Sequence, residues 1–423
     1  MVLELYPLTE GLAIGRDVWL TVVAMLWDRL WRARHMPMKV ADLTPVMISW
    51  LIGRRAVLVK PTAGREAAML GNVDNLGVGG TGTSRAWLTV QAQQDDRSDD
   101  IAEDTLRIFI KMPAASMIER LFLTVFRVYS NELSFYSRVV HHPCFPTEVC
   151  ARLHHVSSVG TRFCIVLDDL TQQEARFPSV LEDYPRAELN MALDTLGKLH
   201  AAFFGQPPAE VWTDCWSCQR TSPSSLQPVN PRPPFYRVIA ESTLQTVLTR
   251  FPGLIPDNIL AGYKIFIARF EEIRRAWSTG SLTLVHGDAH RGNMFFKPHH
   301  SGLYDMQCVT VEHPIHDVVY HLMTSYDVHQ LALEEQDILR TYLECLNSRL
   351  AKRDPPVAPL AWDEAWLMYR EHAWWTLTAF IISAGASDLM AQNFSRVILS
   401  RICTAMERVD CLGALRELLA NVK

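Results

Sequence analysis

HGDAHRGN, residues 286–293, stands between two short apolar runs and is the most informative stretch of this chain. A lone acid, Asp305, follows in the segment YDMQ. An acid, an Asn five residues later and a second acid twelve residues beyond form the order that phosphoryl-transfer enzymes use. The first carboxylate orients and deprotonates a hydroxyl, while the Asn and the second carboxylate hold Mg²⁺ against the nucleotide phosphates. This order predicts a kinase with Asp288 as the base and Asn293 and Asp305 as metal ligands.

Local geometry explains the spacing. A strand that ends at Val285 would deliver Asp288 on a tight loop, and Gly287 would allow a turn in which a Cβ atom would clash. A return strand would place Asn293 beside the first strand, and the next hairpin would bring Asp305 opposite. His290 and Arg291 would face either the phosphates or solvent. Asn and Asp oxygens suit Mg²⁺, which takes waters and phosphate oxygens as its other ligands. An ordinary hairpin with polar residues has the same pattern, so the upstream sequence is needed to separate the two.

The HGDxHxxN pattern resembles the catalytic loop of the aminoglycoside phosphotransferase and choline kinase superfamily, and is nearest to its ecdysteroid kinase-like, or CHK kinase-like, group. DMQ at 305–307, Pro314 and DVVYHL at 317–322 are similar to that group's IDxQ…P…DLAYxL stretch. The resemblance implies a protein-kinase-like α/β fold with a small β-rich amino-terminal lobe and a larger, mainly helical carboxy-terminal lobe. It also implies ATP and Mg²⁺ as cofactors, a small-molecule alcohol as acceptor, and Asp317 as a brace for the catalytic loop.

A nucleotide-binding lobe is expected upstream of such a loop. Residues 106–111, LRIFIK, alternate and are rich in branched and aromatic side chains, which predicts a strand that ends at Lys111. Apolar residues recur every three or four positions from Phe122 to Tyr136, which predicts a helical pattern that includes Glu132. Lys111 would hold the α and β phosphates, and Glu132 would pair with Lys111. Either residue alone is more commonly a solvent-exposed charge.

Residues 77–82, GVGGTG, match the GxGxxG pattern at Gly77, Gly79 and Gly82. Glycines here would let backbone amides close over phosphates, although a plain flexible loop can have the same sequence. A dinucleotide-binding fold needs a helix directly after the glycines, whereas residues 85–91 have the pattern of a strand. Strand, loop and strand favour a hairpin that covers a nucleotide.

Two further segments are similar to parts of the same superfamily. FCIVLDDL, residues 163–170, resembles the strand and hinge between the lobes, where backbone groups near Asp168 and Leu170 would meet the adenine edge. An internal strand with a polar exit fits these residues equally well. LGKLHA, residues 196–201, resembles a helix of the larger lobe. Its periodicity alone indicates a buried helix with His200 as a packed structural histidine.

Length and composition agree with this organisation. A chain of 423 residues can form two lobes that share a cleft. We expect a helical extension at 1–40, a nucleotide-binding lobe at 41–170, and a catalytic and acceptor-binding lobe at 171–423. A net charge of −5 and a pI near 6.3 give no reason to expect a nucleic-acid partner. Nine scattered cysteines without a secretion signal favour reduced thiols and a cytoplasmic protein.

The amino-terminal residues and one internal segment carry further structural predictions. Residues 18–34 are too short and too charged to span a bilayer, which favours packing on the amino-terminal lobe over peripheral membrane contact. Thr44 and Pro45 predict the start of a short helix that ends near Gly53. The Pro- and Ser-rich residues 206–234 favour a mobile insert.

The carboxy-terminal part has a helical pattern with many aromatic residues, among them the Trp374-Trp375 pair. Core packing between helices is the simpler explanation of these residues. An acceptor pocket for a flat apolar compound or a quaternary ammonium group is the other.

Three other classes of function remain. The first is a pseudokinase that binds nucleotide as an interaction module, although Asp288, Asn293 and Asp305 are all present. The second is a metal-dependent hydrolase with His286, Asp288 and His290 as ligands, which leaves the predicted pairing of Lys111 with Glu132 unexplained. The third is a protein kinase, which the absence of DFG and APE sequences after Asp305 disfavours. None of these patterns identifies the acceptor.

Overall fold

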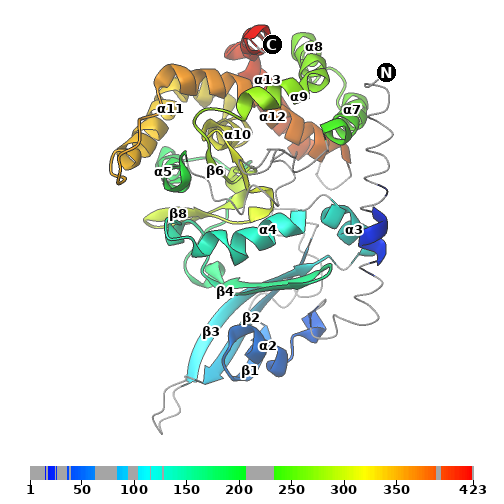
Figure 1. The fold of residues 1–423 in the computed structure, drawn as a ribbon, viewed down its shortest axis with the longest axis vertical. Coiled ribbons are helices and arrows are strands. Elements are labelled where there is room, and N and C mark those ends of the chain that lie inside the picture. Colours follow the sequence, from blue (N-terminus) through cyan, green and yellow to red (C-terminus); the bar gives the residue numbers. More distant parts are fainter. Residues whose placement is uncertain are drawn as a thin grey trace. The chain divides into compact units, whose positions relative to one another are not determined.

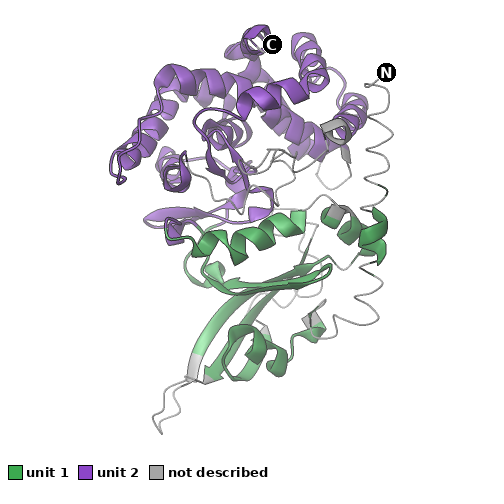
Figure 2. Cartoon of the chain, viewed as in Figure 1, with its two compact units in different colours: residues 1–143, 150–176 green, residues 144–149, 177–423 purple. Residues whose placement is uncertain are grey.

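A computed structural model describes residues 15, 18–23, 25, 36–37, 40–61, 83–93, 103–114, 116–125, 128–205, 233–386 and 392–421. The chain divides into two compact units, which Figure 2 shows in green and purple. Unit 1 comprises Met1–Pro143 and Cys150–Arg176, and unit 2 comprises Cys144–Val149 and Phe177–Lys423.

Unit 1 is built on a five-stranded antiparallel sheet with the strand order β1-β2-β3-β5-β4 (Figure 1). The strands are β1 Ala56–Pro61, β2 Thr83–Gln93, β3 Glu103–Pro113, β4 Leu153–Val159 and β5 Arg162–Asp168. The long β2–β3 pair includes the strands predicted at 85–91 and 106–111, and β5 includes the one predicted within 163–170. Lys111 pairs with Arg85 on one side and with Ile165 on the other, so it lies on a central strand.

Successive side chains of β3 point to opposite faces of this sheet. Ile108, Ile110 and Met112 are fully buried in a core that includes residues of α2 Pro45–Ile52. As predicted, the Thr44 side chain caps α2 and a left-handed Gly53 ends it. Because successive side chains alternate, Lys111 belongs to the opposite face.

That opposite face carries α4 Val128–Ser137, which follows α3 Met117–Val125. The ring of Tyr129 in α4 lies 4.8 Å from that of Phe163 in β5, which fixes the helix against the sheet. The apolar pattern predicted from Phe122 to Tyr136 therefore falls on two helices, and residues 126–127 between them lie outside the described part. Short 3₁₀ turns complete unit 1 at Val40–Asp42, Val139–His141 and Leu170–Gln172.

Unit 2 is mainly helical. Its helices are α5 Arg186–Phe203, α7 Pro233–Arg250, α8 Asp257–Ala268, α9 Phe270–Trp277, α10 Ile315–Ser325, α11 Val328–Leu350, α12 Trp362–Ala386, α13 Gln392–Arg408 and α14 Cys411–Asn421. Its strands are β6 Thr283–Val285, β7 Met294–Lys297, β8 His300–Leu303 and β9 Thr310–Glu312, with 3₁₀ turns at Thr147–Val149, Arg291–Asn293 and Met306–Cys308. A β-rich first unit followed by a larger helical unit confirms the predicted protein-kinase-like α/β fold class.

One predicted detail of unit 2 is wrong. The strand that ends at Val285 does not pair with the strand after the loop; β6 pairs with β9, and β7 pairs with β8. The physical reason is the 3₁₀ turn in which the Asn293 amide donates to His290 O at 2.8 Å, because it sends the chain away from β6. Residues 257–277 form two consecutive helices, α8 and α9, with Arg269 between them.

Several predicted features lie outside the described residues. They include the glycine-rich loop with Gly77, Gly79 and Gly82, and residues 206–232 of the predicted insert. Of residues 18–34, only 18–23 and 25 are described, and these are helical. No helix within the described ranges combines the length and apolar character needed to cross a membrane. No disulfide bond joins the cysteines that the structure describes.

Candidate functional site

The predicted catalytic loop, residues 286–293, begins after β6 with a turn that only glycine can adopt. Gly287 has a φ of 80°, and a Cβ atom there would lie 2.2 Å from the Cys308 carbonyl oxygen. The amides of His286 and Gly287 donate to the Asp317 carboxylate at 2.7 and 2.9 Å. The turn expected at Gly287 and the bracing carboxylate expected at Asp317 are therefore both present.

Asp317 is fully buried and has a third partner, because His200 Nε2 lies 3.1 Å from its Oδ2. His200 is held in turn by the Tyr342 hydroxyl, 2.7 Å from Nδ1. Burial alone would raise the pKa of Asp317, but its interaction with His200 lowers it to about 2. His200 is packed in the core, as predicted, and it also supports the loop brace.

One face of α10 contacts most residues of the predicted catalytic loop. Besides Asp317, His321 Nδ1 lies 2.7 Å from Ala289 O, and Ser325 Oγ accepts from the Arg291 amide at 2.9 Å. Tyr320 donates to Asp288 Oδ1 at 2.6 Å. Only the role of Asp317 was predicted. Positions 317, 320, 321 and 325 have helical spacing within an apolar helix, and this spacing is the signal from which the other contacts could have been inferred.

The Asp288 carboxylate, the predicted base, lies beside Asn293, the predicted metal ligand. Asn293 Nδ2 donates to Asp288 O at 2.9 Å and to Asp288 Oδ2 at 3.0 Å. Because both acceptors are oxygens, the amino group of Asn293 faces Asp288 and its carbonyl Oδ1 is the atom suited to a cation. The contact brings together two residues that are five positions apart, as the sequence predicted.

Asp305 follows Tyr304, whose backbone forms hydrogen bonds with two residues of the loop, His286 and Asn293. The Tyr304 amide donates to Asn293 O at 3.0 Å, and His286 Nε2 donates to Tyr304 O at 2.9 Å. Asp305 itself adopts a left-handed backbone conformation with φ 64° and ψ 59°, which Asp tolerates better than most residues. This turn directs the chain from β8 toward β9 and leaves the Asp305 side chain half-buried.

Both ring nitrogens of His286 are used within the loop. Nε2 donates to Tyr304 O, and Nδ1 accepts from the Asp288 amide at 3.2 Å. These partners require the neutral Nε2–H form and leave no lone pair for a metal ion. Among the described residues, no group of three His, Cys, Asp or Glu side chains is arranged to hold a metal. The His286 geometry counts against the hydrolase interpretation.

His290 and Arg291, two further residues of the loop, have different environments. Burial lowers the pKa of His290, and the carboxylates of Asp288 and Asp305 oppose that shift, so both acids lie near this ring. Arg291 was expected to face either phosphates or solvent, and this expectation is wrong. Arg291 is fully buried, donates to Glu188 Oε2 at 2.8 Å and packs over the Tyr184 ring.

Unit 1 contains the predicted Lys–Glu ion pair. Lys111 Nζ lies 2.8 Å from Glu132 Oε1 and 2.6 Å from Oε2. The two residues are only 5% and 3% exposed, so water screens their attraction weakly. An ammonium group held by a buried carboxylate at the centre of a sheet is the arrangement that nucleotide-dependent kinases use to position phosphates.

The predicted hinge residues follow in the same unit. The Asp168 amide donates to Arg152 O at 2.9 Å, and His154 Nε2 lies 2.6 Å from its carboxylate. Partial burial would raise the pKa of Asp168, but His154, with Gln173 and Arg152, lowers it. Leu170 is buried in a short 3₁₀ turn. The adenine contacts predicted for Asp168 and Leu170 remain a prediction.

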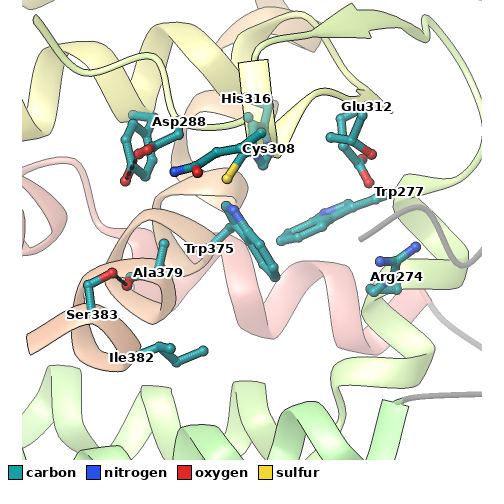
Figure 3. Close-up of a pocket in the computed structure, with 14 residues that line it drawn as sticks. Arg274, Trp277, Asp288, Cys308, Glu312, His316, Trp375, Ala379, Ile382 and Ser383 are labelled. Carbon is teal, nitrogen blue, oxygen red and sulfur yellow. Dashed lines mark hydrogen bonds between the residues drawn. The ribbon is translucent and has the colours of Figure 1, made fainter. Parts of the chain in front are cut away.

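A cavity of about 220 Å³ opens beside Asp288 in unit 2 (Figure 3). It is lined by Arg274, Trp277, Gly287, Asp288, Gln307, Cys308, Thr310, Glu312, His316, Tyr320, Trp375, Ala379, Ile382 and Ser383. The adjacent tryptophans of α12 have different roles, because Trp375 lines this cavity whereas Trp374 is fully buried and stacks on Phe266. Core packing therefore explains Trp374, whereas the acceptor-pocket interpretation stays a prediction for Trp375.

Phosphotransferases use a loop of this kind, braced by a buried carboxylate such as Asp317, and a buried ion pair such as that of Lys111 and Glu132. The family model described as the ecdysteroid kinase-like family matches residues 85–354, well over half of the chain. The chain therefore belongs to the ecdysteroid kinase-like family, which confirms the resemblance identified from the sequence. No curated protein matches this chain.

Several solved structures are similar to the chain. A choline/ethanolamine kinase family protein from Mesorhizobium loti has 12% identity and a TM-score of 0.41, covering 78% of this chain and 90% of that chain. Choline kinase from Streptococcus pneumoniae has 10% identity and a TM-score of 0.40, covering 86% and 94%. A macrolide 2'-phosphotransferase from Brachybacterium faecium has 12% identity and a TM-score of 0.38, covering 75% and 88%. Sequence identities and TM-scores this low do not identify the acceptor of this protein.

We expect Asp317→Asn to destabilise the protein in a pH-dependent way. An unfolded Asp titrates at about 3.9, whereas Asp317 in the fold titrates at about 2. The charged form therefore contributes about 2–3 kcal/mol above pH 4, and this contribution is lost as the pH falls from about 4 to about 2. Urea unfolding of wild type and variant at neutral pH and at about pH 3 measures the difference. An equal difference at both pH values would contradict the prediction.

Proposed function

We propose that this protein transfers the γ-phosphate of ATP to a hydroxyl group of a small molecule, with Mg²⁺ bound to the nucleotide. One observation carries the proposal: the half-buried Asp288 carboxylate lines a cavity, and the same carboxylate accepts a hydrogen bond from Asn293. A base at the edge of a cavity, next to oxygen ligands for a cation, is what transfer to a bound alcohol requires.

Asp288 would orient the acceptor and remove its proton. Its two oxygens already accept from Tyr320 and Asn293, but a carboxylate has about four lone-pair sites, so each oxygen can accept one further bond. A hydroxyl in the cavity would donate to one of these sites. Its oxygen would then attack the γ-phosphorus, the bond to the β-phosphate oxygen would break to release ADP, and the proton would pass to Asp288.

The residues present fit a magnesium site. Asn293 Oδ1 and the Asp305 carboxylate are hard oxygen ligands, and Mg²⁺ prefers to complete its shell with waters and phosphate oxygens. When bound there, Mg²⁺ would neutralise charge on the phosphates. Asp317 is not assigned to this set, because it is fully buried and already bonded to two backbone amides and His200.

Unit 1 would supply the nucleotide-binding groups. Lys111 would neutralise the α and β phosphates, and Glu132 would hold Lys111 in position. Gly77, Gly79 and Gly82 would close over the phosphates, and the backbone near Asp168 and Leu170 would meet the adenine. The first unit is then the nucleotide-binding part of the protein, and the second unit is the catalytic and acceptor-binding part.

Thermal unfolding with and without MgATP tests the nucleotide site. A ligand at 100 times its dissociation constant adds about 2.7 kcal/mol to the stability of the native state. We expect a shift of that size in the wild type and a much smaller one in Asp305→Ala, which lacks a metal ligand. Asp337→Ala, at an exposed acid of α11, is the matched control and should respond like the wild type.

The outcomes separate the competing functions. No shift with ATP or GTP would count against a nucleotide-dependent enzyme. A shift without phosphate transfer to any alcohol would favour the pseudokinase interpretation. Stabilisation by Zn²⁺ or Mn²⁺ without nucleotide would favour the hydrolase.

A further inference from the structure

The cavity has a polar end formed by residues outside the catalytic loop. Thr310 and Glu312 are two positions apart in β9, so their side chains lie on the same face of that strand. His316, at the start of α10, lines the same cavity. All three residues are buried, with 3%, 8% and 4% of their surfaces exposed. Their side chains offer a hydroxyl, a carboxylate and an imidazole to whatever occupies the cavity.

Two of these groups lack a hydrogen-bond partner among the described residues. They are the Thr310 hydroxyl and His316 Nε2. The other nitrogen of His316 is used, because Nδ1 lies 3.3 Å from His372 Nδ1. Buried polar groups are almost always hydrogen-bonded, since leaving one unsatisfied costs about 1–3 kcal/mol. Two such groups on residues that line one cavity indicate a place for a polar ligand group.

The walls of the cavity are flat and firmly held. The Trp277 indole donates to Glu371 Oε2 at 2.9 Å, and its ring stacks on His372 at 4.2 Å. Trp375 stacks on Phe270 at 5.9 Å. Figure 3 shows Trp277 and Trp375 beside the cavity, with Glu312 and His316 also drawn near them. Rigid aromatic walls favour a ring over a flexible chain, because a ring covers them with little loss of conformational entropy.

The charges of the cavity oppose a negatively charged ligand. Asp288 and Glu312 contribute two carboxylates, and Arg274 contributes one guanidinium group. Burial lowers the pKa of His316, so its imidazole is uncharged at neutral pH. The balance is one net negative charge. An anionic acceptor would meet repulsion from both carboxylates, whereas a neutral or cationic one would not.

The volume of the cavity indicates the size of the ligand part that fits inside it. The cavity that the described residues line measures about 220 Å³, whereas pockets for drug-sized ligands measure roughly 300–1,000 Å³. At about 30 Å³ for each water molecule in the liquid, the cavity corresponds to about seven waters. One six-membered ring with short substituents has a comparable number of heavy atoms.

We propose that this cavity binds a single-ring part of the acceptor, uncharged or cationic, that carries a hydrogen-bond donor besides the reacting hydroxyl. The reacting hydroxyl lies at Asp288, and the second donor is held by Glu312, Thr310 and His316. The assignment of the reacting hydroxyl rests on the proposed function. The ring and the second donor rest on the cavity alone, and their binding can be tested without nucleotide.

Three matched series of ring alcohols test the proposal. Benzyl alcohol lacks a second donor, the 3- and 4-hydroxybenzyl alcohols have one, and the corresponding carboxybenzyl alcohols have an anion in its place. Binding of each compound to the full chain, without ATP, is measured by ligand-observed NMR at neutral pH. We expect the hydroxybenzyl alcohols to bind more tightly than benzyl alcohol by about fivefold or more, and the anionic series to bind least.

Two variants identify the binding groups. Thr310→Val keeps the shape of the side chain, and Glu312→Gln keeps its size and removes its charge. Affinity for the hydroxybenzyl alcohols should fall about fivefold in the first and about tenfold in the second, with little change for benzyl alcohol. Glu344→Gln, at an exposed acid of α11, is the matched control and should bind like the wild type.

Several results would overturn the proposal: no binding of the hydroxybenzyl alcohols, equal binding of all three series, preference for the anions, or affinities that do not respond to Thr310→Val and Glu312→Gln. Selective binding that depends on these two residues supports it. Should the bound compounds then fail to accept phosphate from MgATP, the proposed kinase activity fails while the assignment of the cavity stands.

Discussion

The Asp288→Asn variant is expected to lose about 10²–10⁴-fold in kcat for phosphate transfer while it still binds MgATP. An amide cannot take the proton of the acceptor hydroxyl at neutral pH. The protein around it should change little, because Asp288 is half-buried and Asn has nearly the same shape. ADP release with a ring alcohol that binds the cavity measures turnover, and the MgATP-dependent thermal shift measures nucleotide binding separately.

Tyr320→Phe is the control for this experiment. It removes the 2.6 Å hydrogen bond to Asp288 Oδ1 and leaves the carboxylate in place. A hydrogen bond to a charged group contributes about 1.5–3 kcal/mol, so we expect a loss of about 10- to 100-fold in kcat, smaller than the loss in Asp288→Asn. Undiminished turnover in Asp288→Asn would refute the assignment of the base. Equal losses in the two variants would show that orientation of the carboxylate, and not proton removal, dominates.

Breaking the buried pair in unit 1 is expected to have the largest effect on stability. In Glu132→Gln the ammonium group of Lys111 loses its charged partner while it remains buried. Removing one member of a buried ion pair typically costs about 3–5 kcal/mol, because the other charge is left uncompensated. We expect the free energy of unfolding to fall by that order, and MgATP to cause a smaller thermal shift because Lys111 is no longer held.

A double variant separates stability from nucleotide binding. Lys111→Met with Glu132→Leu replaces both charges with apolar groups of similar volume, which is often neutral for stability. This variant should recover most of the stability lost in Glu132→Gln, yet it should still fail to respond to MgATP. A double variant that binds MgATP normally would contradict the role of Lys111, even if its stability is restored.

The local features of the fold were predictable from the sequence. The strands at 85–91 and 106–111 and the helix from Pro45 to Gly53 follow from periodicity and capping residues, which act over a few positions. The contact between Asp288 and Asn293 follows from a separation of five residues in one tight loop. Lys111 and Glu132 were paired correctly because the family pattern carries long-range information that periodicity does not.

The errors arose where the outcome depended on packing between distant segments. Arg291 carries a charge and was expected at phosphates or solvent, but Glu188 and the Tyr184 ring, both more than 100 positions earlier, bury it. The pairing of β6 with β9 depended in the same way on the direction in which the chain leaves the loop. Secondary-structure propensity acts within one helix or strand. It does not determine against which distant helix or strand that element packs.

The sequence by itself determined the class of protein, the order of the phosphotransfer residues and most of the secondary structure, because these are encoded by residue type and short spacing. Only the tertiary structure decided which groups support and surround the site. It joined Tyr320 to Asp288 and His200 to Asp317, and it brought Thr310, Glu312 and His316 to one cavity with the tryptophans of α9 and α12. The physical reason is that a buried polar group is placed by the packing of apolar faces on separate elements, and many distant arrangements share the same local periodicity.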